Sequence, residues 1–264
     1  MKLDGNLVAV VTGGASGLGR ASAEALASAR AKVAIFDVNE EGGKAVADAI
    51  GGIFCKVDIT SEDSVIAGFE AARAAHGQER VLVHCAQISK GGKTVRYDKA
   101  SGGYVRYSTD DYAFSAQGIL IASYRLASLS ALGMAHAEPL NDDGERGAII
   151  LTASAAAQDA QIGQVGYGSL KAGVNGLVLP LARDLMDIGI RVNSIMPGIF
   201  ATPPMLAVKD RAPAIFEGLA ASVPFPKRLG HPEEFGSLVL ELVRNGYFNG
   251  QTLRLDGAIR MPPK

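Results

Sequence analysis

The sequence predicts a single α/β domain: a doubly wound parallel sheet with helices on both faces. Short apolar runs alternate with segments of helical periodicity, and those runs are continuously apolar, as in strands covered on both sides. No repeat or linker divides the chain, and 264 residues with 48% apolar content can bury one large core. We therefore expect one domain over residues 1–264.

The elements are expected in a regular order. Strands are predicted at 7–11, 32–36, 53–57, 81–85, 148–152, 190–195 and 252–255. Helices are predicted at 17–29, 40–50, 61–76, 110–134, 163–187, 204–219 and 231–244. Two inserts, 89–107 and 138–146, are predicted as surface loops. The segment of about 198–222 leaves a strand end, where such sheets bind ligands, and is predicted as a substrate loop within the domain.

The first strand ends in the glycine-rich run TGGASGLG, which carries Gly13, Gly17 and Gly19. Glycines at these positions allow a tight turn and a close approach of the backbone to a pyrophosphate. The helix that follows presents its N-terminus, which attracts negative charge. The sequence therefore predicts a dinucleotide site where the first strand meets the first helix.

Asp37 ends the second predicted strand and bears on the choice of dinucleotide. A carboxylate there accepts hydrogen bonds from an adenosine ribose and repels a 2′-phosphate. The next residues are Val38 and Asn39, and Ser16 stands in the turn where a phosphate-binding base would otherwise lie. We expect NAD rather than NADP.

The run GYGSLKAG carries Tyr167 and Lys171, and Ser154 lies thirteen residues upstream of Tyr167. Residues four apart on a helix share one face. A lysine ammonium beside a phenol favours the phenolate, so we expect the pKa of Tyr167 to fall from about 10 toward neutral pH. With a serine hydroxyl to hold the substrate oxygen, these groups form a proton-transfer site for an alcohol and ketone pair.

These motifs, together with Asp58 in VDIT and Pro197-Gly198 in NSIMPGIFATPP, resemble those of the short-chain dehydrogenase/reductase family, in the same order along the whole chain. The runs LPLARDLMDIGIRV and VPFPKRLGHPEEFGSLV are similar to its branch of type II 3-hydroxyacyl-CoA dehydrogenases. The resemblance implies a Rossmann-like fold. It also implies an NAD-dependent oxidoreductase that interconverts a secondary alcohol and a ketone by hydride transfer.

By the same resemblance, Tyr167 is the catalytic base, Ser154 polarises the substrate oxygen, and Lys171 lowers the pKa of Tyr167 and binds the nicotinamide ribose. The residues implied to bind NAD are Gly13, Ser16, Gly17, Leu18, Gly19, Asp37, Asp58, Ile59, Cys85, Ala86, Gln87, Tyr167, Lys171, Pro197, Gly198, Phe200 and Thr202.

The branch implies a 3-hydroxyacyl-CoA or a cyclic, steroid-like alcohol as substrate. The predicted substrate contacts are Ala156, Gln161, Gln164, Phe200 and Leu206. Small residues beside Ser154 leave room for a bulky alcohol, whereas the two glutamines either contact substrate or cap the helix of Tyr167. Lys90, Lys93 and Arg96 in the first insert are candidates to bind the phosphates of an acyl-CoA.

After the fourth strand, the family's usual Asn-Asn-Ala-Gly reads His84-Cys85-Ala86-Gln87. Gln87 adds a side chain where backbone normally lies close to the cofactor. We expect His84 to be a hydrogen-bonded residue at the strand end rather than a new catalytic base.

A further departure concerns an asparagine that the family uses in a proton relay from the lysine. Alignment on Tyr112 puts Ile119 at that position, unless Gln117 or Ser115 replaces the asparagine after a small register shift. Isoleucine cannot hydrogen-bond. An NAD-binding subunit with weak or no turnover is therefore the alternative function.

The net charge of −1 gives no basic field that would suggest nucleic acid or an anionic membrane as a partner. No apolar stretch approaches 18 residues without a charge or glycine, so we expect no membrane-spanning helix. The first strand begins within ten residues of the start, which leaves no room for a targeting peptide and favours a cytoplasmic location.

Cys55 and Cys85 lie in or beside strands and are expected to be small buried residues, not a disulfide or metal pair. We expect no metal site. The expected partner is a small-molecule alcohol or ketone, and the family resemblance implies a homotetramer.

Overall fold

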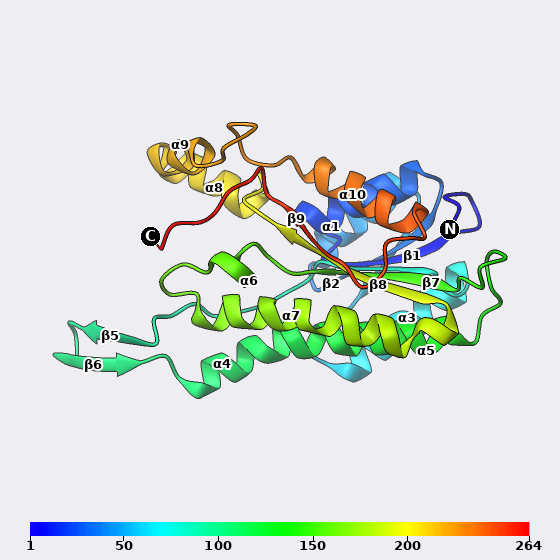
Figure 1. Ribbon diagram of the computed structural model, residues 1–264, viewed down its shortest axis with the longest axis horizontal. Coiled ribbons are helices and arrows are strands. Elements are labelled where there is room, and N and C mark those ends of the chain that lie inside the picture. The colour runs from blue at the N-terminus through cyan, green and yellow to red at the C-terminus, as the bar shows by residue number, and fades with distance from the viewer. Residues whose placement is uncertain (264) are drawn as a thin grey trace.

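Seven parallel strands form the central sheet, in the order β3-β2-β1-β4-β7-β8-β9 (Figure 1). This computed structural model describes residues 1–263. The strands are β1 (Val8–Thr12), β2 (Lys32–Asp37), β3 (Ile53–Lys56), β4 (Val81–His84), β7 (Gly147–Thr152), β8 (Ile190–Pro197) and β9 (Thr252–Leu255). The seven predicted strands are confirmed. The strand order reverses between β1 and β4, which creates a crevice at their carboxyl ends.

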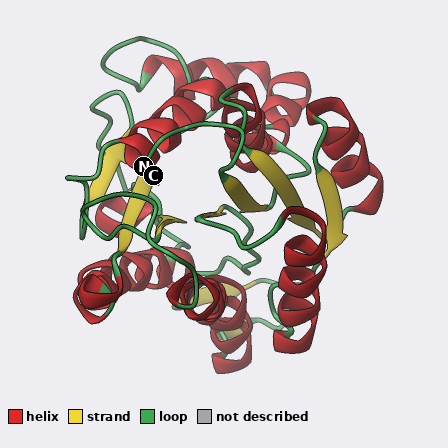
Figure 2. Ribbon diagram, turned by 90° about the vertical axis from the view of Figure 1, so that its right-hand side faces the viewer, coloured by secondary structure: helices red, strands yellow, loops and turns green. Residues whose placement is uncertain are grey.

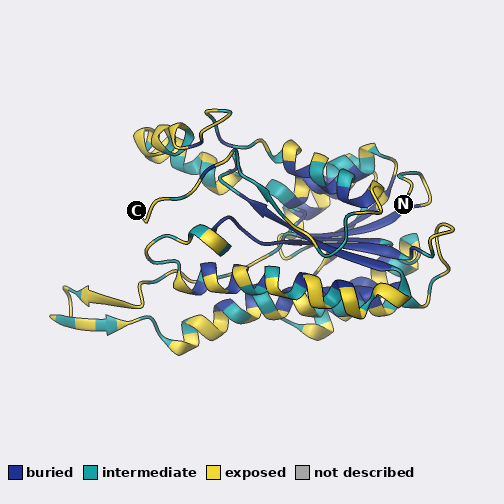
Figure 3. Cartoon of the chain, in the orientation of Figure 1, coloured by how far each residue is buried: buried dark blue, intermediate teal, exposed yellow. Residues whose placement is uncertain are grey.

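Helices cover both faces of this sheet, as Figure 2 shows in a view turned by 90°. On one face lie α1 (Gly17–Ser28), α2 (Glu40–Ile50) and α10 (Pro232–Arg244); on the other lie α3 (Glu62–His76), α5 (Ala122–Ala135) and α7 (Val165–Asp184). Val10 and Leu82 belong to one core, and Val11 and Val83 to the other. Since side chains alternate across a strand, both cores require apolar residues, and the inner strands β1, β4, β7 and β8 are buried along their length (Figure 3).

One long helix comprises α4 (Thr109–Ala116), the π-helical turn η1 (Gln117–Ile121) and α5. By length and composition it could cross a membrane, with a mean hydropathy of 1.4. Gly118 and Arg125 break its apolar sequence, as expected from the sequence, but neither residue ends the helix. Half of its most apolar part is buried in the fold, where Leu126 and Met134 are fully enclosed. Its apolar face is thus a core face.

The insert 89–107 is not only a loop. It contains an antiparallel hairpin, β5 (Val95–Asp98) and β6 (Gly103–Arg106), which projects from the body of the molecule (Figure 1). Tyr97 and Tyr104 face each other across it, with ring centroids 5.5 Å apart. Such cross-strand aromatic pairs stabilise a hairpin, and the abundant glycine and lysine hide this signal in the sequence.

The predicted helix at 204–219 is two helices, α8 (Pro203–Arg211) and α9 (Pro213–Ala221). Pro213 disfavours helical backbone at the preceding residue, and Ala212 accordingly has φ −149° and ψ 70°. A short helix that the sequence does not predict, α6 (Ala156–Asp159), follows β7. The insert 138–146 is a loop, as predicted.

Candidate active site

The turn after β1 forms one wall of the crevice. Gly13 has φ 67°, and a Cβ built on it would lie 2.8 Å from the backbone nitrogen of Ala86, so only glycine fits between the turn and the end of β4. A Cβ on Gly19 would collide with the carbonyl oxygen of Gly13. The backbone of the turn and the N-terminus of α1 are therefore bare, and this cradle fits the pyrophosphate of a dinucleotide.

Two other predicted cofactor residues lie against the same turn. Thr202 lies in the loop after β8. A Cβ built on Gly17 would be 3.3 Å from its Cγ2. The carboxylate of Asp37 accepts hydrogen bonds from the backbone nitrogens of Ala15 (3.1 Å) and Asn39 (2.9 Å). The structure thus brings together the glycine turn, the end of β2 and the loop after β8.

Most remaining cofactor candidates lie at the carboxyl ends of the neighbouring strands, whereas Ser16 and Leu18 lie at the start of α1. Asp58 is exposed and accepts hydrogen bonds from Thr60, whereas Ile59 is buried and its carbonyl accepts one from Arg125 at 2.8 Å. Gly198 donates to the carbonyl of Leu255 at 2.9 Å. Ser16 and Gln87 are exposed, Leu18, Cys85 and Ala86 are partly buried, and Pro197 is buried.

The three predicted catalytic residues come from β7 and α7. Ser154 follows β7 and is 7% exposed; its Oγ accepts a hydrogen bond from Ala156 N at 3.1 Å. Lys171 is 4% exposed, and its Nζ donates to the carbonyl oxygen of Thr152 at 2.7 Å. The same Nζ lies 5.8 Å from the ring centroid of Tyr167. The last residue of β7 therefore holds the lysine beside the tyrosine.

The pKa values of this pair differ from the expectation. Burial raises the pKa of Tyr167, and the neighbouring Ser154 hydroxyl acts in the opposite direction. Burial lowers the pKa of Lys171 to about 8. The expected decrease for Tyr167 is therefore wrong for the chain by itself, because desolvation penalises the phenolate more than its neighbours favour it.

His84 is hydrogen-bonded at the end of β4, which confirms the prediction. Its Nδ1 lies 2.7 Å from Oγ1 of Thr12, which also accepts a hydrogen bond from Ala86 N at 3.2 Å. Burial and then the charge of Lys171 lower the pKa of His84 to about 3, so the ring is neutral near pH 7 and a poor base. Thr12 was not predicted, although its place at the end of β1 is visible in the sequence.

Cys85 lies at the same strand end. Its Sγ accepts a hydrogen bond from Oγ1 of Thr152 at 3.4 Å. Burial raises the pKa of this thiol to about 11. The side chain is therefore a neutral packing residue, as the sequence suggested for both cysteines.

Ile119, which the alignment puts at the asparagine position, lies in the core, and the alignment itself stays a prediction. Ile119 is 1% exposed and belongs to the core between the sheet and α5, whereas Gln117 is exposed. Ser115 is fully buried, and its Oγ accepts a hydrogen bond from Lys90 N, in the loop after β4, at 3.0 Å. The π-helical turn η1 widens the helix and shifts its faces, which the sequence does not reveal.

On the predicted substrate side, Oε1 of Gln164 accepts a hydrogen bond from Gln161 N at 2.9 Å, and Nε2 of Gln161 donates to Pro262 O at 3.1 Å. Both glutamines thus hold the loop that leads into α7. The predicted capping of that helix is wrong, since Gln164 is its N-cap residue but makes no side-chain capping hydrogen bond, and their contact with substrate stays a prediction. Ala156 is 2% exposed and Leu206 is exposed on α8.

Phe200 is predicted to contact both cofactor and substrate. It is 6% exposed, and its ring packs edge-on against Phe235 of α10 with centroids 6.3 Å apart. The ring therefore supports the predicted substrate loop from the core side, and its contacts with ligands stay a prediction.

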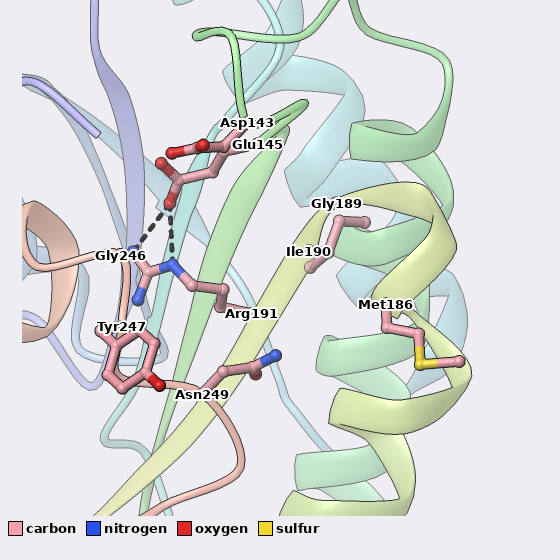
Figure 4. Close-up of a pocket in the computed structure, with 9 residues that line it drawn as sticks. All are labelled: Asp143, Glu145, Met186, Gly189, Ile190, Arg191, Gly246, Tyr247 and Asn249. Carbon is pink, nitrogen blue, oxygen red and sulfur yellow. Dashed lines mark hydrogen bonds and ion pairs between the residues drawn. The ribbon is translucent and has the colours of Figure 1, made fainter.

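A cavity of about 520 Å³ lies far from these residues, at the amino ends of β7 and β8 (Figure 4). Its lining includes Glu145 and Arg191, which form a buried ion pair at 2.8 Å. Each nitrogen of this guanidinium already donates to Glu145 or to a backbone carbonyl. This guanidinium has no donor left for a ligand, so the pair is structural.

Comparisons with known proteins agree with this geometry. The model of the family described as enoyl-(acyl carrier protein) reductase matches residues 13–259. The chain is 42% identical over 260 residues to a 3-hydroxyacyl-CoA dehydrogenase type-2 of Drosophila melanogaster, covering 98% of this chain and 99% of that protein. It is 40% identical over 259 residues to the protein of the same name from Homo sapiens, covering 97% and 96%.

A solved structure is also similar. The crystal structure of 3-hydroxyacyl-CoA dehydrogenase type-2 from Mycobacterium avium superposes with a TM-score of 0.89 at 41% identity, covering 100% of both chains. The similarity therefore extends over the whole fold, including every segment that contributes to the crevice.

Proposed function

The chain belongs to the short-chain dehydrogenase/reductase family of oxidoreductases, and on this premise we propose that it oxidises a secondary alcohol to a ketone with NAD as the hydride acceptor. One observation carries the proposal: the burial of Lys171 beside Tyr167 at the carboxyl edge of the sheet. Lysine is rarely buried to this degree unless it is paired. Among residues 1–263, no carboxylate forms an ion pair with it, which favours a catalytic use of its charge.

In the proposed reaction, Tyr167 as phenolate accepts the hydroxyl proton of the alcohol. Ser154 donates a hydrogen bond to the same oxygen and so stabilises the forming carbonyl. Lys171 stabilises the phenolate through its ammonium group and exchanges protons with it. A bound nicotinamide ring supplies the hydride acceptor and, when oxidised, a positive charge beside the phenol. Acid–base catalysis of this kind contributes roughly 10²–10⁴-fold to the rate.

NAD is proposed over NADP because of Asp37. Its carboxylate is held by two backbone amides at the edge of the glycine turn, where a ribose hydroxyl of NAD would donate to it. A 2′-phosphate would meet this negative charge, and the next residues, Val38 and Asn39, offer no cation to offset it.

For the substrate we propose a 3-hydroxyacyl-CoA, with a cyclic or steroid-like alcohol as the alternative. The printed names of the relatives favour the first. So does the charge of the insert 89–107, which carries five Lys or Arg and one Asp. Lys90 pairs with Asp111 and Arg96 with Asp98, whereas Lys93 has no ion pair within the described part of the chain. These cations suit the phosphates of coenzyme A.

The other expectations stay proposals. Exposed apolar side chains on the long helix and on α7, such as Tyr124, Leu132 and Leu179, support a homotetramer, which light scattering would test. Neither a nucleic acid nor a membrane is proposed as a partner, and a cytoplasmic location remains the proposal.

The test is an assay of NADH formation with hydroxyacyl-CoAs, their pantetheine analogues and cyclic alcohols, run in parallel with NADP. We expect turnover with NAD that is greatest for a CoA thioester and that decreases by at least about 10³-fold in Tyr167→Phe. Comparison with the pantetheine analogues isolates the contribution of the nucleotide phosphates. If no substrate exceeds the Tyr167→Phe control while NAD still binds, the chain is instead the NAD-binding subunit with weak or no turnover.

A further inference from the structure

Tyr107, at the base of the β5–β6 hairpin, is a partly buried phenol that no step of the proposed reaction uses. Its Oη donates a hydrogen bond to the carbonyl oxygen of Lys90 at 3.0 Å and lies 3.2 Å from Oγ of Ser115. Ser115 in turn accepts from the backbone nitrogen of Lys90. The three residues thus attach the loop after β4 to α4.

The ring of Tyr107 also fills the space that two glycines leave open. A Cβ built on Gly92 would lie 2.6 Å from Cδ2 of this ring, and a Cβ on Gly166 would lie 2.9 Å from its Oη. The three atoms nearest to that Cβ on Gly166 all belong to Tyr107. Gly166 is buried in the first turn of α7 and directly precedes Tyr167. The phenol is therefore packed against the backbone that carries the proposed base.

A backbone connection lies beside this contact. The nitrogen of Gly92 donates to the carbonyl oxygen of Gly163 at 2.8 Å, and Gly92 forms an isolated β-bridge with Gln164. The N–H groups of a helix's first turn have no partners inside the helix, so contacts from outside hold that turn in place. The hydrogen bond from Gly92 to Gly163 and the packing of Tyr107 on Gly166 hold the start of α7 from outside the helix, without giving a partner to its first N–H groups.

We propose that Tyr107 is a positioning residue for the reaction: it holds the first turn of α7 and thereby keeps the Tyr167 phenol aligned with Ser154 and the crevice. This inference rests on the proposed function. It does not require that Tyr107 touch substrate or cofactor. The base of the hairpin therefore has a positioning role, which is separate from the proposed binding of substrate phosphates by Lys and Arg of the insert 89–107.

The first test is Tyr107→Phe, which removes Oη and keeps the ring. We expect kcat to decrease about tenfold, while KM and the Kd for NAD stay as in the parent, because only the alignment of the reacting groups changes. Tyr104→Phe is the matched control, since Tyr104 is 79% exposed on the same hairpin and its ring packs on Tyr97. A parental kcat for Tyr107→Phe would overturn the proposal.

The second test uses Gly166→Ala, whose new methyl group would press on Oη of Tyr107. We expect this variant to lose activity and the double variant with Tyr107→Phe to regain part of it, because the other ring atoms lie at an ordinary 3.4 Å. If Gly166→Ala loses the same activity alone and in combination with Tyr107→Phe, the contact does not position α7 and the proposal fails.

A third measurement separates this inference from the function on which it rests. Hydrogen exchange of the amides of residues 163–169 is expected to be faster in Tyr107→Phe than in the parent and in Tyr104→Phe. It needs no turnover. An inactive parent therefore contradicts the proposed function, whereas parental exchange in Tyr107→Phe contradicts the positioning role.

Discussion

Tyr167 and Lys171 are both buried, and burial moves their pKa values in opposite directions: upward for the phenol and down to about 8 for the amine. The pair therefore loses its first proton near pH 8. Alcohol oxidation needs the deprotonated pair as proton acceptor, and ketone reduction needs the protonated pair as donor. The two directions of the reaction must then depend on pH with opposite sign.

We expect the rate of alcohol oxidation to rise as the pH increases through about 8 and the rate of ketone reduction to decrease over the same interval. Measurement of kcat in both directions from neutral to alkaline pH tests this. Lys171→Met, which removes the ammonium beside the buried phenol, should displace both transitions upward by more than about one pH unit. Identical pH profiles for the two directions would show that another group controls the proton transfer.

Residue identity alone pointed to most of these side chains but not to their hydrogen-bond partners. Spacing on a helix predicted that Tyr167 and Lys171 share a face, and the glycine pattern predicted the bare turn. Nothing local showed that Thr152 O would hold Lys171 or that Thr12 would pair with His84, because those partners are far away in sequence. The raised pKa of Tyr167 was missed for the same reason, since burial depends on the whole fold.

At the scale of elements, the long helix with its π-helical turn decides which side chain faces the site. The structure has Ile119 in the core and Ser115 bonded to the loop after β4. A single extra residue in a helical turn rotates every following side chain, and sequence periodicity does not detect it. The hairpin and the break between α8 and α9 were missed for more local reasons, a glycine-rich composition and a proline.

Replacing Ile119 with asparagine tests whether position 119 lies in the core or faces the site. We expect Ile119→Asn to lower the free energy of unfolding by about 3 kcal/mol, because it loses buried apolar surface and leaves an amide without partners. It should not increase activity. Urea denaturation gives the stability, and Gln117→Asn, on the exposed side of the same turn, is the control. An unchanged stability with a faster reaction would mean that position 119 faces the site after all.

At the scale of the whole molecule, Glu145 and Arg191 join distant parts of the chain. Glu145 accepts from Arg191 on β8 and from the amino group of Met1, and Arg191 also donates to backbone carbonyls near the end of α10. The loop 138–146 is exposed over most of its length, yet Glu145 is buried. Burial raises its pKa, but the hydrogen bond from the amino group and the charge of Arg191 outweigh this and lower it.

We expect Glu145→Gln to lower the free energy of unfolding by about 3 kcal/mol at neutral pH, because it leaves the Arg191 charge buried without its partner. Since the pKa of Glu145 is lower in the folded state, its stabilisation is complete above the unfolded pKa of 4.5. It is lost as the pH falls below that value through the folded pKa. Thermal unfolding as a function of pH measures both effects.

The matched control is Glu241→Gln, whose partner Arg244 is on the same exposed face of α10; little change is expected there. Equal free energies of unfolding for the two variants would show that the buried ion pair does not join these distant parts of the chain. The same conclusion would follow if Glu145→Gln lost stability in acid as the parent does.

The sequence by itself determined the α/β class, the seven strands, the dinucleotide cradle and the identity of the three proposed catalytic residues. Each of these depends on a short-range pattern: apolar runs, glycine spacing and residues one helical turn apart. The tertiary structure alone decided the register of the long helix, the contacts of Lys171 and His84, and the packing of Tyr107 on the helix of Tyr167. These depend on which distant atoms meet and on how completely they exclude water, and burial sets both the pKa values and the hydrogen-bond partners.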